Sequence, residues 1–292
     1  MISERSSSAR ASMASWWFPL MPRGRVATMR AIVYGFVFVD VLLTNPWVAG
    51  HAHLPGPLYE PLFIGRILPL PVPTLAVVRG VEIALLISAA VALTGRFVRV
   101  AGAAVFFLYL EWMVIAFSYG KVDHDRFAFL VALAVLPTVG AARWGDRTPD
   151  QAAGWAIRCI QVGVVATYFL AVFAKLRFGG IEWVNGATLM RAVIRRGTWL
   201  GEPLEDLPGL LVATQYWIMI FELASPLLFV PGRIGRLWWW ISVVFHIVTF
   251  STIGIIFLPH LVCLLSFRQL ERFDPRALLD RVRARARAPA PG

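Results

Sequence analysis

Residues 158–186 read RCIQVGVVATYFLAVFAKLRFGGIEWVNG, and the rest of the chain can be placed around them. An apolar segment long enough to cross a bilayer ends at Lys175, and a glycine-containing turn leads on to Trp183 and Gly186. A lysine at the end of such a segment has two interpretations. Its ammonium group reaches the lipid headgroups along its own aliphatic stem, or it faces the interior of a helix bundle and acts as a base.

Composition places the whole chain in the class of helical membrane proteins. Hydrophobic residues make up 58% and charged residues 15% of the 292 positions, which excludes an ordinary soluble domain and a disordered chain. Apolar runs near the bilayer-spanning length recur, and only helices satisfy every backbone group in lipid over such runs. We therefore expect an all-α, polytopic transmembrane bundle.

The apolar runs predict eight membrane-spanning helices. The last two come from one run that is too long for a single span, and Gly254 and Pro259 divide it. The segment 51–73, rich in proline and glycine, is predicted to be a re-entrant or surface loop, and 187–196 a short amphipathic helix on the membrane surface. The eight predicted spans cover residues 31–50, 74–94, 98–119, 127–142, 153–175, 210–230, 237–252 and 255–268.

The distribution of arginines predicts how the chain is oriented. The division is an interfacial tail (1–30, with Trp16 and Trp17), a transmembrane domain (31–268) and a basic tail (269–292). With eight spans, most arginines lie on the side of both termini, which the positive-inside rule assigns to the cytoplasm. We expect a multi-pass protein of the cytoplasmic membrane, with Lys175 and the 119–126 hairpin together on its outer side. This orientation accounts for the net charge of +11, so no nucleic-acid partner is expected.

Several motifs resemble the vitamin K-dependent gamma-carboxylase family and the bacterial group that shares its membrane domain, the horizontally transferred transmembrane (HTTM) domain. The first motif is YFLAVFAKL at 168–176, followed by Trp183 and Gly186. The second is the Asp-His-Asp hairpin at 123–125, and the third is FHIVTFSTIGIIF at 245–257. Glu222 with the proline four residues later matches a further feature. The resemblance covers most of residues 27–268.

The resemblance implies roles for particular residues. The lysine that matches Lys175 is the family's proposed base, which deprotonates a reduced quinone, and the histidine that matches His124 is implicated in a carbanion step. Two positions depart from the family pattern, since Val172 stands where a glycine is usual and Ala174 where a second lysine is usual. The eukaryotic carboxylases hold their peptide in a large C-terminal extramembrane domain that has no counterpart here, so no protein substrate is expected.

The ionisable residues inside the predicted spans have two interpretations. They pair with one another across helices, as the three-residue spacing of Arg79 and Glu82 predicts, or they line a polar cavity. The hairpin around His124 is a solvated turn, or else a proton shuttle whose pKa the carboxylates of Asp123 and Asp125 raise. His246 is an interhelical hydrogen-bonding group or part of a site.

No metal site is evident in the sequence. Cys159 and Cys263 each lie in an apolar run, without a CxxC pair or a His/Cys cluster at zinc spacing, so we interpret them as core residues. The cofactor stays unspecified; a diphosphate substrate would bring Mg²⁺ with it.

Two functional hypotheses follow. The first is a lyase- or cyclase-type membrane enzyme acting on an isoprenoid lipid or a quinone, by terpenoid cyclisation or by quinol-linked oxygenation or carboxylation-like chemistry. Lys175, His124, Asp123 and Asp125 would be the catalytic residues, with one aspartic acid as general acid in cyclisation. The second hypothesis is a non-catalytic membrane scaffold or assembly factor with a lapsed site. The predicted substrate-binding residues are Trp112, Tyr168, Trp183, Arg195, Arg196, Trp217, Glu222 and His246, with the two arginines holding a diphosphate if one is present.

Overall fold

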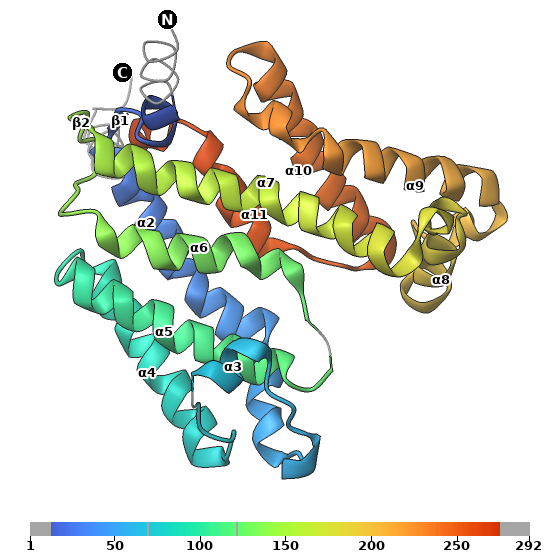
Figure 1. The fold of residues 1–292 in the computed structure, drawn as a ribbon, viewed down its shortest axis with the longest axis horizontal. Helices are drawn as coiled ribbons and strands as arrows, with labels where there is room; N and C mark the ends of the chain where they lie inside the picture. Colours follow the sequence, from blue (N-terminus) through green and yellow to red (C-terminus); the bar gives the residue numbers. More distant parts are fainter. Residues whose placement is uncertain (1–12, 69, 121, 275–292) are drawn as a thin grey trace, which may run out of the picture. The chain divides into compact units, whose positions relative to one another are not determined.

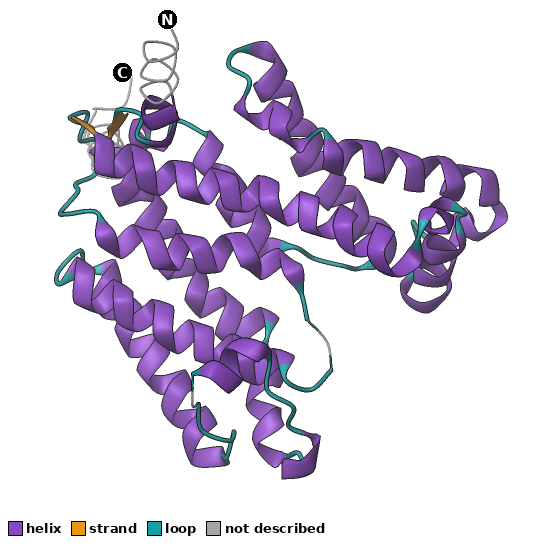
Figure 2. Cartoon of the chain, viewed as in Figure 1, coloured by secondary structure: helices purple, strands orange, loops and turns teal. Residues whose placement is uncertain are grey.

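The computed structural model describes residues 13–68, 70–120 and 122–274, and helices dominate them (Figures 1 and 2). The predicted all-α fold class is confirmed for this part of the chain. Its two strands, β1 (Met21–Pro22) and β2 (Pro149–Asp150), form a single short antiparallel pair. The labelled helices are α2 (Arg23–Val39), α3 (Phe63–Ile67), α4 (Leu75–Leu93), α5 (Val98–Phe117), α6 (Phe127–Val135), α7 (Gln151–Gly179), α8 (Ala187–Arg196), α9 (Pro208–Leu223), α10 (Arg233–Ile253) and α11 (Leu258–Leu264).

The chain forms two compact units. Within the described residues, the first comprises 13–68, 70–120, 130–160 and 268–274. The second comprises 122–129 and 161–267. The second unit contains the C-terminal half of α7 and all of α8 to α11, and therefore holds the three sequence motifs described above.

Among the described residues, five helices are long and apolar enough to cross a membrane: α2 with its π-helical extension Asp40–Thr44, α4, α5, α7 and α10. Helix α9 and the segment Leu258–Phe267 are apolar but shorter. Helix α6 has nine residues and continues only as the 3-10 turn Leu136–Thr138. The helices predicted over 127–142 and 255–268 are therefore shorter than expected. Pro137 cannot donate to a regular helical ladder, which ends α6 before it. Pro259 lies in the first turn of α11 and sets the start of that helix. The total of eight crossings stays a prediction.

Two predicted helix ends are wrong, each for a local reason. Helix α2 begins at Arg23 rather than near residue 31, because the N–H groups of Arg23 and Gly24 donate to the carbonyls of Thr148 and Asp146. Helix α7 continues to Gly179, and Gly180 follows with a φ of 61°. Lys175 therefore lies one turn inside α7 and does not end it.

Other local predictions are confirmed. Helix α10 ends at Gly254, which has a φ of 63°, and α11 begins with Pro259 in its first turn. The segment 187–196 forms the predicted helix, α8, and the described residues of 51–73 hold only 3-10 turns and the five-residue α3. The placement of both segments at a membrane surface stays a prediction. Most of the predicted basic tail, from residue 275 onward, lies outside the described residues.

The polar residues buried in the first unit hold helices and turns together. Arg30 donates to the carbonyl oxygens of Leu136, Val139 and Gly140, which satisfies the end of the 3-10 turn after α6. Asp40 accepts hydrogen bonds of 2.7 Å from the hydroxyl of Tyr109 and from the amide of Asn45. In this unit Arg30 and Asp40 are therefore bonded across elements to uncharged groups, and these bonds do not pair the two charges with each other.

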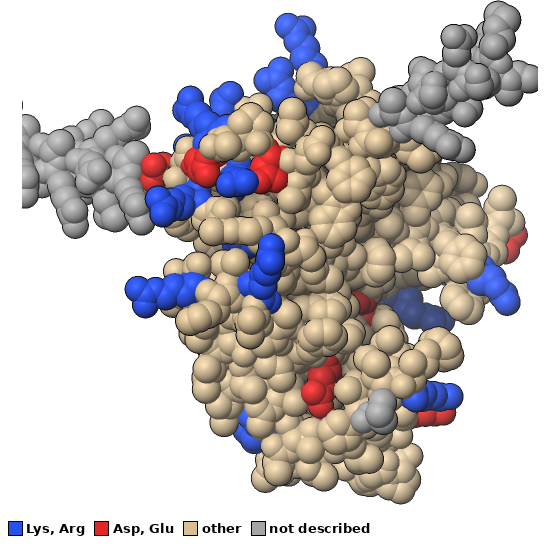
Figure 3. All heavy atoms as spheres, turned by 60° about the vertical axis from the view of Figure 1, so that its left-hand side comes forward, with Lys and Arg blue, Asp and Glu red and all other residues tan. Residues whose placement is uncertain are grey.

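Arg79 and Glu82, one turn apart on α4, form the predicted ion pair at 2.5 Å. On the face drawn in Figure 3, charged side chains gather in small groups and most of the surface carries uncharged residues. The window of α10 that meets the length and hydropathy of a span is only 11% buried, so this helix exposes a broad apolar surface.

Candidate functional site

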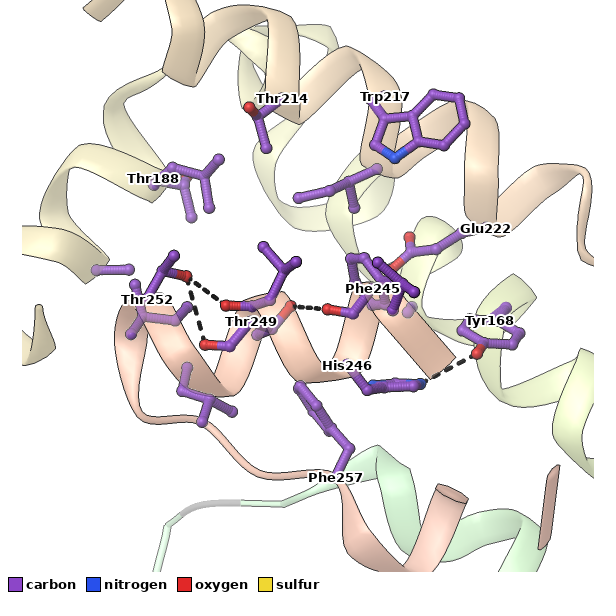
Figure 4. A pocket seen from close by; sticks show the side chains of 18 of the residues that line it. Tyr168, Thr188, Thr214, Trp217, Glu222, Phe245, His246, Thr249, Thr252 and Phe257 are labelled. Atoms are coloured by element: carbon purple, nitrogen blue, oxygen red, sulfur yellow. Dashed lines mark hydrogen bonds between the residues drawn. The ribbon is translucent and has the colours of Figure 1, made fainter. Parts of the chain in front are cut away.

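The second unit contains a cavity of about 1020 Å³. Its wall is formed by α7, α8, α9, α10, the turn at 124–125 and the start of α11. Helix α10 and α9 contribute mainly apolar side chains, several of which are half exposed, including Trp217, Trp240 and Val244. A volume of this size takes a ligand as large as a long-chain lipid. Figure 4 shows Thr214 and Trp217 of α9 across the cavity from His246 and Phe257.

Helical spacing on α7 sets the polar end of the cavity. Tyr168, Ala171 and Lys175 are separated by three and four residues, so they share one face and all line the cavity. The opposite face of the same turns, with Phe169 and Phe173, is exposed and apolar. The sequence pattern of this segment therefore turns Lys175 away from the exposed apolar side of its helix.

Lys175 is paired inside the cavity. Its ammonium nitrogen lies 2.5 Å from both carboxylate oxygens of Glu222 on α9, and the two side chains are 18% and 6% exposed. The same nitrogen lies 5.1 Å from the ring centroid of Trp183. Gln215 of α9 donates to the carbonyl of Trp183 and so fixes that 3-10 turn. The pair thus joins residues 47 positions apart and leaves the cavity without a net charge at this end.

A cluster of aromatic and imidazole rings lines the cavity beside this pair. A hydrogen bond of 3.1 Å joins the hydroxyl of Tyr168 and Nε2 of His246. The ring of His260, on α11, lies 4.7 Å from Tyr168 and 5.2 Å from His246, measured between ring centroids. Phe257 packs on His246 at 5.3 Å. All three polar side chains are at most 5% exposed.

His124 lines the same cavity, but its electrostatics differ from the prediction. Burial by the surrounding protein is the main factor and lowers its pKa; the positive charge of Lys175 lowers it further, and Asp123 raises it by less. The expectation that flanking carboxylates raise the pKa of His124 is therefore wrong. The residue is exposed by its surface area and lines the cavity, and its ring lies 6.2 Å from that of Phe257.

The two aspartates of this hairpin differ in their position relative to the cavity. Asp125 is buried, lines the cavity and pairs with the guanidinium of Arg126 at 2.9 Å. Asp123 does not line the cavity. The ion pair holds Asp125 as a carboxylate, which disfavours the role of general acid expected for one of the two.

Five of the predicted substrate-binding residues line the cavity along with Lys175 and His124: Tyr168, Trp183, Trp217, Glu222 and His246. Three others do not. Trp112 is fully buried in α5, within the first unit. Arg195 and Arg196 are exposed on α8, whose cavity-lining positions include Leu189 and Val193. Trp112 belongs to a helix of the first unit, and Arg195 and Arg196 lie on the exposed side of α8, so these three residues do not line this cavity. Their role in substrate binding stays a prediction.

The sequence analysis did not single out His260 as a site residue. It is 1% exposed, lines the cavity and stacks edge-on with Tyr168. The available signal was a histidine one residue after Pro259 in an apolar run. That signal could not show that α11 returns to α7 and α10.

Within the described residues, no group of three or more His, Cys, Asp or Glu side chains is arranged to hold a metal ion. A Mg²⁺–diphosphate site would need free carboxylates. Those on the cavity wall, Asp125 and Glu222, are each bonded to a cation. The residues present therefore do not fit such a site.

Comparison of the chain with protein-family models, with curated proteins and with solved structures found no match.

Proposed function

We propose that this chain is a multi-pass enzyme of the cytoplasmic membrane that acts on an isoprenoid lipid held in the cavity of its second unit. The observation that carries the proposal is the position of Lys175. Its side chain is 18% exposed and lines the cavity together with His124, away from the exposed apolar side of α7. A lysine that snorkelled to the headgroups would have supported the scaffold hypothesis instead.

Proton transfer is the chemistry that these groups support. Lys175 rests as an ammonium beside the Glu222 carboxylate, 2.5 Å away. Transfer of that proton to Glu222 breaks one N–H bond, forms one O–H bond and leaves a neutral amine, which then takes a proton from the substrate. The low polarity of the cavity reduces the free-energy cost of this transfer, because the neutral pair buries no charge. His124, neutral because its pKa is lowered, is a second proton acceptor on the same wall.

The remaining proposals concern topology and relatedness. Eight crossings with both termini in the cytoplasm are supported by the arginine distribution. The short helices α6 and α11 are compatible with this topology, because non-helical backbone at membrane depth is tolerated where protein buries it, and Phe129, Leu133 and Cys263 are fully buried. Relationship to the carboxylase-like HTTM group is supported by the motifs that supply Lys175 and His124.

Of the two reaction types, base-initiated chemistry has the better support. Cyclisation needs an acid to protonate an alkene or epoxide, and Asp125 is held as a carboxylate by Arg126. The scaffold alternative rests on Val172 and Ala174, the two departures from the family pattern.

The test is product formation by the purified protein in lipid nanodiscs, with menaquinol, farnesyl and geranylgeranyl diphosphates and their epoxides as candidate substrates. We expect one of them to be converted, and Lys175→Ala and His124→Ala to lower turnover by about a hundredfold or more. Arg177→Ala, two positions along the same helix, is the matched control and keeps its activity. A product that forms equally in the Lys175 and His124 variants would exclude both residues as catalysts.

A further inference from the structure

Three imidazole nitrogens on the cavity wall have no hydrogen-bond partner among the described residues. They are Nδ1 of His246 and both ring nitrogens of His260. The side chains are 5% and 1% exposed, and both line the cavity. A buried polar atom without a partner is rare and destabilises the folded protein. Because both residues line the cavity, a ligand that turns either ring toward this space would supply the missing partners.

The chemistry of these nitrogens indicates which group would bind. No acidic side chain is bonded to either ring, and burial favours the uncharged imidazole. An uncharged imidazole has one N–H donor and one acceptor nitrogen. A hydroxyl group also donates once and accepts, so it complements an imidazole pair better than a group that only accepts. The hydroxyl of Tyr168 already makes such a bond, at 3.1 Å to His246.

Charge on the cavity wall argues against an anionic ligand. Among the described residues that line the cavity, Lys175 is the only lysine or arginine, and Glu222 neutralises its charge. Arg126 is bonded to Asp125, and the arginines of α8 do not line the cavity. A phosphate or diphosphate would enter this space without the cationic hydrogen-bond donors that such groups require.

The rest of the cavity is apolar. Side chains such as Leu211, Val244 and Ile253 line the space between α8, α9 and α10. A hydrocarbon chain fits this lining, with its polar end at the histidines.

We propose that Tyr168, His246 and His260 form a binding subsite for the hydroxyl group of an uncharged long-chain lipid alcohol, whose hydrocarbon chain lies between α8, α9 and α10. This inference rests on the proposed function, and it narrows the isoprenoid substrates to uncharged ones.

The test measures binding to the nanodisc-reconstituted protein. The probes are geranylgeraniol, its methyl ether, which has no hydroxyl donor, and geranylgeranyl diphosphate. We expect the alcohol to bind at least tenfold more tightly than the diphosphate. His260→Leu should weaken alcohol binding about tenfold, equivalent to about 1.4 kcal/mol, and leave binding of the ether nearly unchanged. His260→Gln, which keeps a donor and an acceptor, should recover part of the loss.

The control is His51→Leu, which changes a histidine of the first unit that also has an unpartnered Nδ1. It should bind the alcohol as the unchanged protein does. Equal or tighter binding of the diphosphate, or unchanged alcohol binding by folded His260→Leu protein, would overturn the hydroxyl subsite. These outcomes are separate from the turnover test: a protein that binds the alcohol through His260 but converts no substrate keeps the subsite and loses the proposed enzyme activity.

Discussion

The contact between Lys175 and Glu222 determines where the lysine side chain lies. A lysine near the end of an apolar helix is ordinarily placed at the membrane surface by its long stem. Here Glu222, one carboxylate on a neighbouring helix, lies 2.5 Å from the ammonium group and lets it remain inside a largely apolar cavity. Burial of either charge alone would be strongly unfavourable, so each residue depends on the other for its place.

His124 leads to a prediction about pH. Its pKa is below the ordinary value of 6.5 in the folded protein, chiefly through burial and then through the charge of Lys175. Below about pH 6.5 the unfolded chain therefore binds a proton that the folded protein does not, and folding stability falls as the pH drops. His124→Gln removes this contribution. We expect the melting temperature of the variant to fall less than that of the unchanged protein between about pH 7.5 and 5.

The melting curves are recorded in detergent, and the difference between the two proteins isolates His124 from other histidines. Asp123, which raises this pKa, works in the opposite direction but is the smaller influence. If the unchanged protein were the more acid-resistant of the two, the lowered pKa of His124 would be refuted.

At the scale of single elements, the two halves of α7 have different roles. Its C-terminal half presents Tyr168 and Lys175 to the cavity. Its N-terminal half packs against the polypeptide before β1: the guanidinium of Arg158 lies 4.6 Å from the ring of Trp16. About one turn before Arg158 on the same helix, Gly154 has no side chain, and this allows the backbone of Pro19 to approach α7 closely. The helix is therefore anchored within the first unit by small and aromatic residues near its start.

Gly154 provides a test of that anchoring. A β-carbon at this position would lie 1.5 Å from the carbonyl oxygen of Pro19, so either the helix or the preceding segment must move. We expect Gly154→Ala to destabilise the protein by about 1–3 kcal/mol, as overpacked sites do. The matched control is Gly80→Ala on α4, where no atom lies within 4 Å of the added carbon. There the higher helix propensity of alanine should stabilise the protein by up to about 1 kcal/mol.

Thermal unfolding of both variants in the same detergent measures these changes. An equal effect of the two substitutions would show that the contact between Gly154 and Pro19 does not constrain the protein.

At the scale of the whole molecule, length and hydropathy identify five helices able to cross a membrane, whereas the arginine distribution favours eight crossings. The difference lies in α6, α9 and α11, which are apolar but short. An even number of crossings leaves both termini on one side, and five crossings would leave them on opposite sides. The sides of the membrane on which the two termini lie therefore distinguish eight crossings from five.

The prediction is that fluorescent-protein fusions at either terminus fold in the cytoplasm. In a chain with Cys159 and Cys263 replaced by alanine, Val122→Cys should react with a membrane-impermeant maleimide added outside the cell, because Val122 is exposed and lies in the outer hairpin. Arg147→Cys, exposed in a loop assigned to the inner side, should react only after the cells are opened. Termini on opposite sides would contradict the eight-span topology.

Composition and periodicity were sufficient for the fold class and for several local features. The end of α10 at Gly254, the amphipathic α8 and the Arg79–Glu82 pair were all predictable, because each depends on residues within a few positions of one another. The start of α2 was not, since it depends on carbonyl groups of residues 146 and 148, far along the chain.

The sequence by itself determined that this chain forms apolar helices and that Lys175 and His124 carry ionisable groups near their ends. Only the tertiary structure decided what surrounds those groups. The ion pair with Glu222, the loss of Trp112 and Arg195 from the site and the presence of His260 in it all depend on which helix faces meet. Contacts of that kind join residues distant in sequence, and no local pattern encodes them, because packing across helices sets both partner and distance.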